Sequence, residues 1–184
     1  MSVLVRLEDG VLRLTLSEPV FNASMGAELL RELHRTDVQC FLIDGVDPMF
    51  CSGGVEGLSV EIFQFREWIT KPVVCAVQGA ALGAGLALVA NAHVAVVAQG
   101  TSFGCTEIRT GDWPVGFAAI CKAIGDRRAL EMAMSGRVFG APEALQMGLV
   151  HEIAPAFEYD DRAEAIARHL ASQPLAGRLP VSGS

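Results

Sequence analysis

A stretch of 27 residues, Pro72–Ala98, contains no Asp, Glu, Lys or Arg. A run of this length and apolarity is either a membrane-spanning helix, for which roughly 20 residues suffice, or the interior of a folded domain. Gly79 and Gly83 have the GxxxG spacing of paired membrane helices, which favours the first interpretation. The stretch opens on β-branched valines, typical of a buried strand, and no Trp or Tyr anchors either end at a membrane surface. We therefore interpret it as part of a globular core.

Glycines divide this core stretch into a strand, a loop, a helix and a second strand. The expected order is a strand Val73–Val77, a helix carrying Leu82, Leu86, Leu88 and Val89, a break at Asn91-Ala-His93, and a strand Val94–Ala98. A glycine loop that leads into a helix exposes backbone N–H groups at the positive end of the helix dipole. Such a place can hold an anion or an oxyanion. The alternative is that the glycines only allow close helix–strand packing, and the stretch alone leaves both open.

Composition and charge exclude several classes of protein. A chain of 184 residues suffices for one domain, and 51% apolar against 19% charged residues indicates surface buried between subunits or a deep core. The net charge of −7 gives no support to nucleic-acid binding. Five cysteines without a CxxC pair predict reduced thiols, so we expect no metal and no disulfide. The N-terminus lacks the apolar segment of a signal peptide, and we expect a cytoplasmic protein.

Strand and helix patterns alternate along the rest of the chain, which predicts an α/β fold. We expect strands at Val3–Leu7, Val11–Leu16, Val38–Ile43 and Leu149–Ile153, and helices at Met25–Leu33, Glu56–Thr70, Phe117–Ile124, Arg127–Ser135, Pro142–Met147 and Asp160–Ser172. Ser24 and Asp126 are the expected N-caps of two of these helices. We place the core of the domain in residues 1–155 and assign 156–184 to a short C-terminal helix and a disordered tail.

A second glycine-rich turn, Phe50–Gly54, follows the strand expected at Val38–Ile43. Because Gly53 and Gly54 allow the chain to turn sharply, this turn can present the backbone N–H of Ser52 into a cleft. A simple surface turn is the alternative. Together with the glycine loop of the core stretch, the turn would supply a two-donor oxyanion site.

Three segments carry a resemblance to a known family. Phe50-Cys-Ser-Gly-Gly54 is similar to the motif F-x-[AS]-G-[GA], and Lys71–Gly85 is similar to KPVIAAVxGxAxGGG. Phe103–Gly111, followed by Pro114, is similar to FGxPExxxGxxP, and the likeness continues through 130–136 and 141–150. In these segments, at family spacing, the chain resembles the crotonase superfamily, the enoyl-CoA hydratases and isomerases.

The resemblance implies a crotonase-like ββα spiral, with stacked sheets flanked by helices. It implies a substrate that is an acyl thioester of coenzyme A or of an acyl-carrier protein, with no cofactor beyond that coenzyme A, and a homo-oligomer, a trimer or hexamer. The backbone N–H groups of Ser52 and Ala84 would hold the thioester oxygen. The glycines that shape the two loops would be Gly53, Gly54, Gly83 and Gly85.

The resemblance also implies the catalytic base. Hydratases of this family use two glutamates, whose positions fall here on Ala87 and Glu107. A single carboxylate can take a proton from one carbon and return it to another, so Glu107 alone favours double-bond isomerisation over hydration. The alternative is that Glu107 is a solvated residue at a helix start. Asp112 and Trp113 are possible auxiliary residues.

Two departures from the family keep other functions open. The segment between Gly54 and Lys71 is short, and the chain stops where family members continue for about three more helices. A swapped arrangement, a partner subunit or a carrier-protein substrate would each fit. One alternative is a relative of the polyketide decarboxylases and dehydratases, although Ala80 stands where those enzymes carry a histidine. The other is a catalytically degenerate crotonase that acts as a binding or assembly partner.

Overall fold

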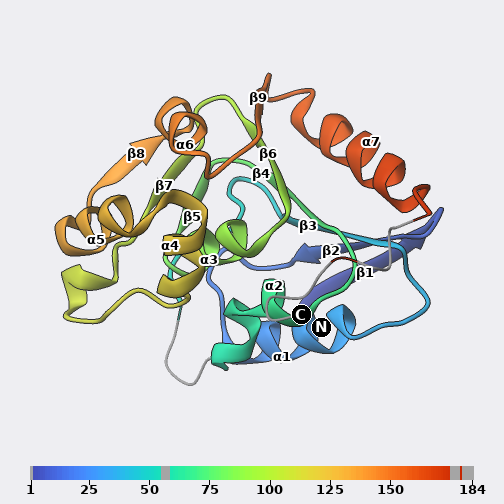
Figure 1. Ribbon diagram of the computed structural model, residues 1–184, viewed down its shortest axis with the longest axis horizontal. Coiled ribbons are helices and arrows are strands. Elements are labelled where there is room, and N and C mark those ends of the chain that lie inside the picture. The colour runs from blue at the N-terminus through green and yellow to red at the C-terminus, as the bar shows by residue number, and fades with distance from the viewer. Residues whose placement is uncertain (1, 55–58, 175–178, 180–184) are drawn as a thin grey trace.

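The computed structural model describes residues 2–54, 59–174 and 179, and it contains two β-sheets with helices around them (Figure 1). The six-stranded sheet has the order β1-β2-β3-β4-β6-β9 and the three-stranded sheet has the order β5-β7-β8. The strands of the large sheet are β1 Val3–Glu8, β2 Val11–Leu16, β3 Cys40–Gly45, β4 Val73–Val77, β6 Val94–Ala98 and β9 Glu152–Ala154. The strands of the small sheet are β5 Ala80–Leu82, β7 Ser102–Gly104 and β8 Val138–Gly140. The α/β expectation is confirmed.

The large sheet is parallel except at its first edge, where β1 and β2 form the expected hairpin at Asp9-Gly10. In the small sheet β5 and β7 are parallel, and β7 and β8 are antiparallel. Each of these three strands has three residues. Strands this short do not show a hydrophobic alternation from which they could be predicted. The expected helix residue Leu82 instead ends β5, and the strand expected at Leu149–Ile153 begins only at Glu152.

Helices cover both faces of the large sheet, α7 on one side and α1 on the other (Figure 1). The helices are α1 Ala23–Leu33, α2 Phe65–Trp68, α3 Ala84–Asn91, α4 Phe117–Ile124, α5 Asp126–Ser135, α6 Ala141–Met147 and α7 Tyr159–Ala171, with 3₁₀ segments at Val60–Phe63 and Glu107–Thr110. The strand β4 is buried on both faces, because alternate side chains point to opposite sides of a sheet. Cys75 lies in the cluster with α1 and α3, whereas Val74 lies in the cluster with α7.

The core stretch 72–98 is therefore a β4–β5–α3–β6 unit inside the domain. Among the described residues no helix has both the length and the apolarity that crossing a bilayer requires. Every residue of α3 is buried, so the helix is surrounded by protein on all sides. This helix and the two turns beside it are the centre around which the candidate site is built.

An arginine fastens α7 to the sheet. Arg13 of β2 donates from Nε to Asp44 Oδ2 at 2.9 Å and from Nη1 to Glu164 Oε2 at 3.1 Å, and it also pairs with Asp160. Ala163 and Ala167 of α7 are fully buried beneath this network. Burial raises the pKa of Asp44, with Arg13 acting against that shift. The C-terminal helix is thus packed as a layer of the domain.

Three local expectations are wrong. The N-cap of α1 is Asn22, whose Oδ1 accepts from Met25 N at 2.9 Å, rather than Ser24. Asp126 is the first residue of α5, and the cap position belongs to Gly125 at φ 86°.

The third concerns the helix expected at Glu56–Thr70. Residues 55–58 lie outside the described part of the chain, and the remainder divides at Gln64 into the 3₁₀ segment and α2. The buried side chain of Asn91 accounts for the division, because its Nδ2 donates to Phe63 O at 2.7 Å and takes a carbonyl that a continuous helix would use internally. The tail expected to be disordered lies mostly outside the described residues.

Candidate active site

The carboxyl group of Glu107 lies where the two glycine-rich turns meet. A Cβ atom placed on Gly83 would be 3.3 Å from Glu107 Cδ, 3.3 Å from Glu107 Oε1 and 3.3 Å from Gly53 Cα. Gly83 also has φ 54°, a left-handed conformation that favours glycine. Three motifs that are far apart in the sequence therefore converge on one point, as the resemblance implied.

Glu107 is held by backbone groups of its own loop. Its Oε1 accepts from Val115 N at 3.3 Å, and its main-chain oxygen accepts from Thr110 Oγ1 at 2.8 Å and from Asp112 N at 3.1 Å. Its Oε2 is buried and has no hydrogen-bond partner among the described residues. A half-buried carboxyl with one unpaired oxygen differs from the solvated residue of the alternative interpretation.

The environment of Glu107 favours its protonated form. Burial raises the pKa of the Glu107 carboxyl above its ordinary value, the N–H groups around it act against this shift, and the charge of Asp112 adds to it. Displaced pKa values are frequent among catalytic acids and bases. A raised pKa makes the Glu107 carboxylate a stronger base than an ordinary glutamate.

The two amides expected to form an oxyanion hole are both occupied in this structure. Ala84 N donates to Gly53 O at 3.1 Å, and Ser52 N donates to Pro19 O at 2.6 Å. The second bond belongs to a short bridge between Val20 and Ser52. A substrate oxygen would have to replace the carbonyls of Gly53 and Pro19 to be held by these two amides.

The glycines bring the two turns into close contact. A Cβ on Gly85 would lie 2.3 Å from the carbonyl oxygen of Cys51, nearer than any real Cβ approaches. Cys51 also bridges Ala81, and Leu82 N donates to Cys51 O at 3.0 Å. Close packing, the alternative role for these glycines, is therefore present beside the convergence on Glu107. Gly54 is exposed at the end of the described turn.

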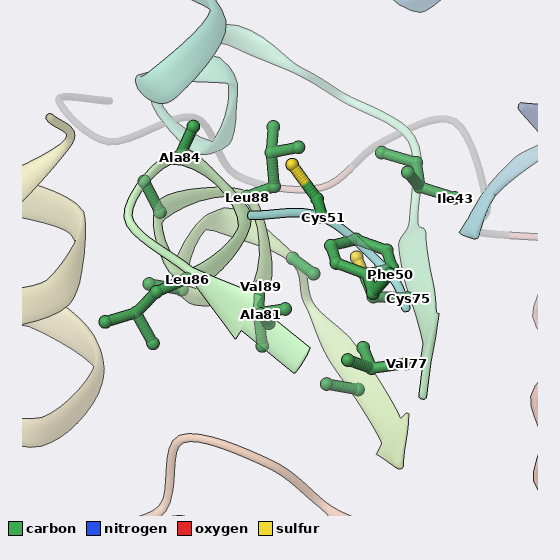
Figure 2. Close-up of a cluster of buried hydrophobic side chains, with 14 of the residues drawn as sticks. Ile43, Phe50, Cys51, Cys75, Val77, Ala81, Ala84, Leu86, Leu88 and Val89 are labelled. Atoms are coloured by element: carbon green, nitrogen blue, oxygen red, sulfur yellow. The ribbon is translucent and has the colours of Figure 1, made fainter. Parts of the chain in front are cut away.

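Apolar side chains behind the turn fix its position. Figure 2 shows Phe50 and Cys51 of the turn in one buried cluster with Cys75 and Val77 of β4 and Leu88 of α3. Phe50 and Cys51 are fully buried. The first turn is thereby anchored to the same strand and helix that carry the second turn.

Ala87, which occupies the position of the second hydratase glutamate, has no free space around it. Ala87 is fully buried, and a Cβ on Gly116 would lie 2.8 Å from Ala87 Cβ and 3.0 Å from Phe63 Cβ. A carboxylate side chain at position 87 has no space in this packing. Val115, Gly116 and Phe63 were not anticipated as site residues, although Gly111 and Gly116 in the sequence mark the loop that brings Val115 to Glu107 and Gly116 to Ala87.

The auxiliary candidates lie at the margin of the site. Asp112 is exposed, and its Oδ2 accepts from Thr110 Oγ1 at 3.1 Å. Trp113 is 50% exposed and contacts Phe117 edge-on, with the ring centroids 5.0 Å apart. Asp112 acts on Glu107 through its charge, and Trp113 packs against the start of α4.

Thiol chemistry has no support at this site. Burial raises the pKa of Cys51 and of Cys105 to about 12, so both stay protonated near neutral pH. Since the thiolate is the nucleophile, these cysteines act as small apolar side chains. Glu107 is therefore the candidate reactive side chain at the meeting point of the two turns.

Solved structures share this architecture. A putative enoyl-CoA hydratase/isomerase from Mycobacterium abscessus superimposes with a TM-score of 0.84 at 27% identity, covering 94% of this chain and 78% of that one. An enoyl-CoA hydratase from Bacillus anthracis superimposes with a TM-score of 0.85 at 23% identity, covering 95% and 78%. The fold is that of the crotonases.

Sequence comparison identifies the family. Residues 6–178 match the model of the enoyl-CoA hydratase/isomerase family. The 1,2-epoxyphenylacetyl-CoA isomerase of Escherichia coli is 31% identical over 95% of this chain and 78% of its own length. A probable enoyl-CoA hydratase of Rhodobacter capsulatus is 32% identical over 95% and 77%. The chain belongs to the enoyl-CoA hydratase/isomerase family.

Proposed function

We propose that this protein moves a double bond within an acyl thioester of coenzyme A or an acyl-carrier protein, with Glu107 as the single acid–base group. The observation that carries the proposal is the buried, unpaired Oε2 of Glu107 beside Gly53 and Gly83. Relatives named as an isomerase and as a probable hydratase of CoA thioesters support the substrate class.

The proposed reaction needs one base and one anion site. The Glu107 carboxylate takes a proton from Cα of a 3-enoyl thioester, and the C–H electron pair moves into a dienolate whose charge lies on the thioester oxygen. Glu107 then returns that proton to Cγ, and the double bond becomes Cα=Cβ. No other reactant is consumed, so the step balances.

The amides of Ser52 and Ala84 are the proposed donors to the enolate oxygen. Each such donor contributes about 3 kcal/mol of transition-state stabilisation in precedents of this kind. Binding would exchange the carbonyls of Pro19 and Gly53 for the substrate oxygen.

Isomerisation is favoured over hydration because of position 87. Adding water to a double bond calls for a second group that orients the water. Ala87 provides no such group, and Phe63 and Gly116 fill the space around it. A base that serves two carbons in turn needs only one carboxylate.

Proton exchange tests the proposal directly. A 3-enoyl-CoA is incubated with the protein in deuterium oxide, and deuterium at Cα and Cγ is followed by NMR. Glu107→Gln should lower the exchange rate by at least about 100-fold, while Glu131→Gln, a change of an exposed glutamate on α5, should leave it unchanged. Equal rates in wild type and Glu107→Gln would show that the base is another group.

A second candidate function is a binding or assembly partner without catalysis. The observation in its favour is that both proposed oxyanion donors are bonded to protein carbonyls. Saturable binding of an acyl-CoA with no deuterium exchange above the buffer background would support this candidate. A decarboxylase is less supported, because Ala80 begins β5 where that chemistry would use a histidine.

A further inference from the structure

A cavity of about 280 Å³ lies between α2, α3 and α4, at the end of α3 opposite to Glu107. Its lining includes Phe63, Arg66, Asn91, His93 and Lys122. A second cavity of about 150 Å³ shares Arg66, His93 and Lys122 and adds His151. We call the first the Arg66 cavity. Phe63 is the one residue described at the candidate active site that also lines the Arg66 cavity.

The polar lining of the Arg66 cavity combines donors on Arg66, His93 and Lys122 with acceptors on Gln64 and Glu67. His93 accepts from Val73 N at Nδ1, at 3.0 Å, so a neutral imidazole carries its proton on Nε2. Burial, followed by the charge of Arg66, lowers the pKa of His93 to about 4, and the ring is neutral near pH 7. Its Nε2–H forms no hydrogen bond to a described residue and is available to a ligand.

Arg66 adds a cation that lacks an acidic partner. Within the described part of the chain its contact is a long bond of 3.4 Å from Nη1 to Ala92 O, and a guanidinium has five N–H donors. Lys122 is paired with Glu67 at 2.6 Å, so that pair is neutral. The charge left over on the cavity rim is positive.

The Arg66 cavity also has an apolar part. Its apolar lining residues are Phe63, Ala118 and Ala119 of α4, and Leu179. A cavity that joins an apolar wall to a cationic edge matches an amphiphilic anion. Arginine binds planar carboxylates with particular geometric fit.

We propose that the Arg66 cavity binds a carboxylate that carries a short apolar body. The carboxylate would lie against Arg66 and the Nε2–H of His93, with Lys122 nearby, and the apolar body would lie against Phe63 and the alanines of α4. Nothing in the proposed isomerase mechanism requires this site.

The carboxylate has two possible sources. Gly83, Ala87 and Asn91 follow one face of α3 at four-residue intervals, so the cavity is about 12 Å along the helix from Glu107. An acyl group held at Glu107 would reach it with a distal carboxylate if the Phe63 side chain moves from its place beside Gly116 and Ala87, and this source rests on the proposed function. The other source is a free carboxylic acid that binds independently of any thioester.

Titration with hexanoate tests the site itself. Hexanoate should shift the His93 imidazole signals in a saturable manner, whereas 1-hexanol at the same concentrations should not. Arg66→Gln should weaken hexanoate binding at least about tenfold, and Lys122→Gln should weaken it as well. Arg6→Gln, which removes an exposed arginine on β1, is the matched control and should have no effect. Circular dichroism confirms folding of each variant.

Two thioesters distinguish the sources. If dodecanedioyl-CoA, whose chain is long enough to span about 12 Å along α3, binds at least about tenfold more tightly than dodecanoyl-CoA, and Arg66→Gln removes the difference, the distal end of the substrate is the ligand. If the two thioesters bind equally and hexanoate still binds in their presence, the ligand is a separate acid. The proposal is overturned if hexanoate leaves His93 unshifted, or if its affinity is the same in wild type and Arg66→Gln. These readouts are independent of Glu107, so the isomerase proposal can fail while this one stands.

Discussion

The amide of Ala84, the first residue of α3, donates to the carbonyl oxygen of Gly53 at 3.1 Å. This bond joins the two glycine-rich turns directly, and Glu107 lies against the same pair of turns. The contact is close because neither Gly83 nor Gly85 carries a side chain there. Stability and proposed chemistry therefore depend on the same few backbone atoms.

Gly85→Ala should destabilise the protein for a purely steric reason. Alanine is the better helix former, but its Cβ would lie 2.3 Å from Cys51 O, and overpacking of this kind costs about 1–3 kcal/mol. Urea unfolding measures the loss. Gly26→Ala is the matched control, because on α1 the new Cβ would lie 3.3 Å from the edge of the Phe21 ring, and its effect should be smaller. Equal stability of Gly85→Ala and wild type would contradict the observed contact.

The rate of proton exchange should depend on pH through Glu107. The base acts in its ionised form, and burial raises its pKa, so the acidic limb of the rate profile should lie above the ordinary glutamate range. Asp112→Asn removes a nearby negative charge and should move that limb to lower pH. Rates measured from pH 4 to pH 9 on both proteins test this, and identical profiles would exclude an electrostatic role for Asp112.

Glu107→Gln should make the protein more stable at neutral pH. A carboxyl whose pKa is higher in the folded than in the unfolded state is favourable to folding in its protonated form, and that contribution is lost as pH rises through the folded-state pKa. At pH 7 the ionised group therefore opposes folding, and the neutral amide does not. Urea unfolding should show a gain at pH 7 that shrinks toward pH 4. A loss of stability at pH 7 would argue against the buried environment of Oε2.

Removing Arg13 should loosen α7. Asp44 is 8% exposed, and Arg13→Met would leave its carboxylate without its cation, at a cost of about 3 kcal/mol. Arg168→Met removes an arginine whose partners are exposed or half-exposed and should cost much less, because solvent screens exposed ion pairs. Chemical denaturation compares the two. A similar small effect at both positions would mean that the network around Arg13 contributes little.

Ala87→Glu should fail to create a hydratase. The larger side chain meets Phe63 and Gly116, and placing a carboxylate there without partners costs about 3 kcal/mol or more of folding free energy. Phe63→Ala combined with Ala87→Glu should recover part of that loss, because it frees space beside position 87. Water addition to crotonyl-CoA, followed by absorbance, should stay at background in the single variant.

Long segments with a clear hydrophobic period were predictable from the sequence. The hairpin β1–β2, the unit β4 to β6 and the helices α4 to α7 were found within a few residues of their expected positions. The small sheet was not anticipated, since three-residue strands give no period. The division of the segment before Lys71 was also missed, because Asn91 holds Phe63 from across the fold.

For the candidate site, motifs predicted the meeting of Glu107 with the two glycine turns. They did not predict that Ser52 N is bonded to Pro19 O, since that bond arises from a bridge between residues over 30 positions apart. The role of each site residue in catalysis stays a prediction. The lack of free space around Ala87 could not be inferred from the sequence, because it depends on how Phe63 and Gly116 pack.

The buried amide of Asn91 bonds both Phe63 O and Ala87 O. This single side chain joins the 3₁₀ segment to α3, so the backbone of the segment keeps a fixed distance from the helix whose first amide is a proposed donor to the substrate oxygen. Side chains elsewhere in the segment can therefore change without moving that amide.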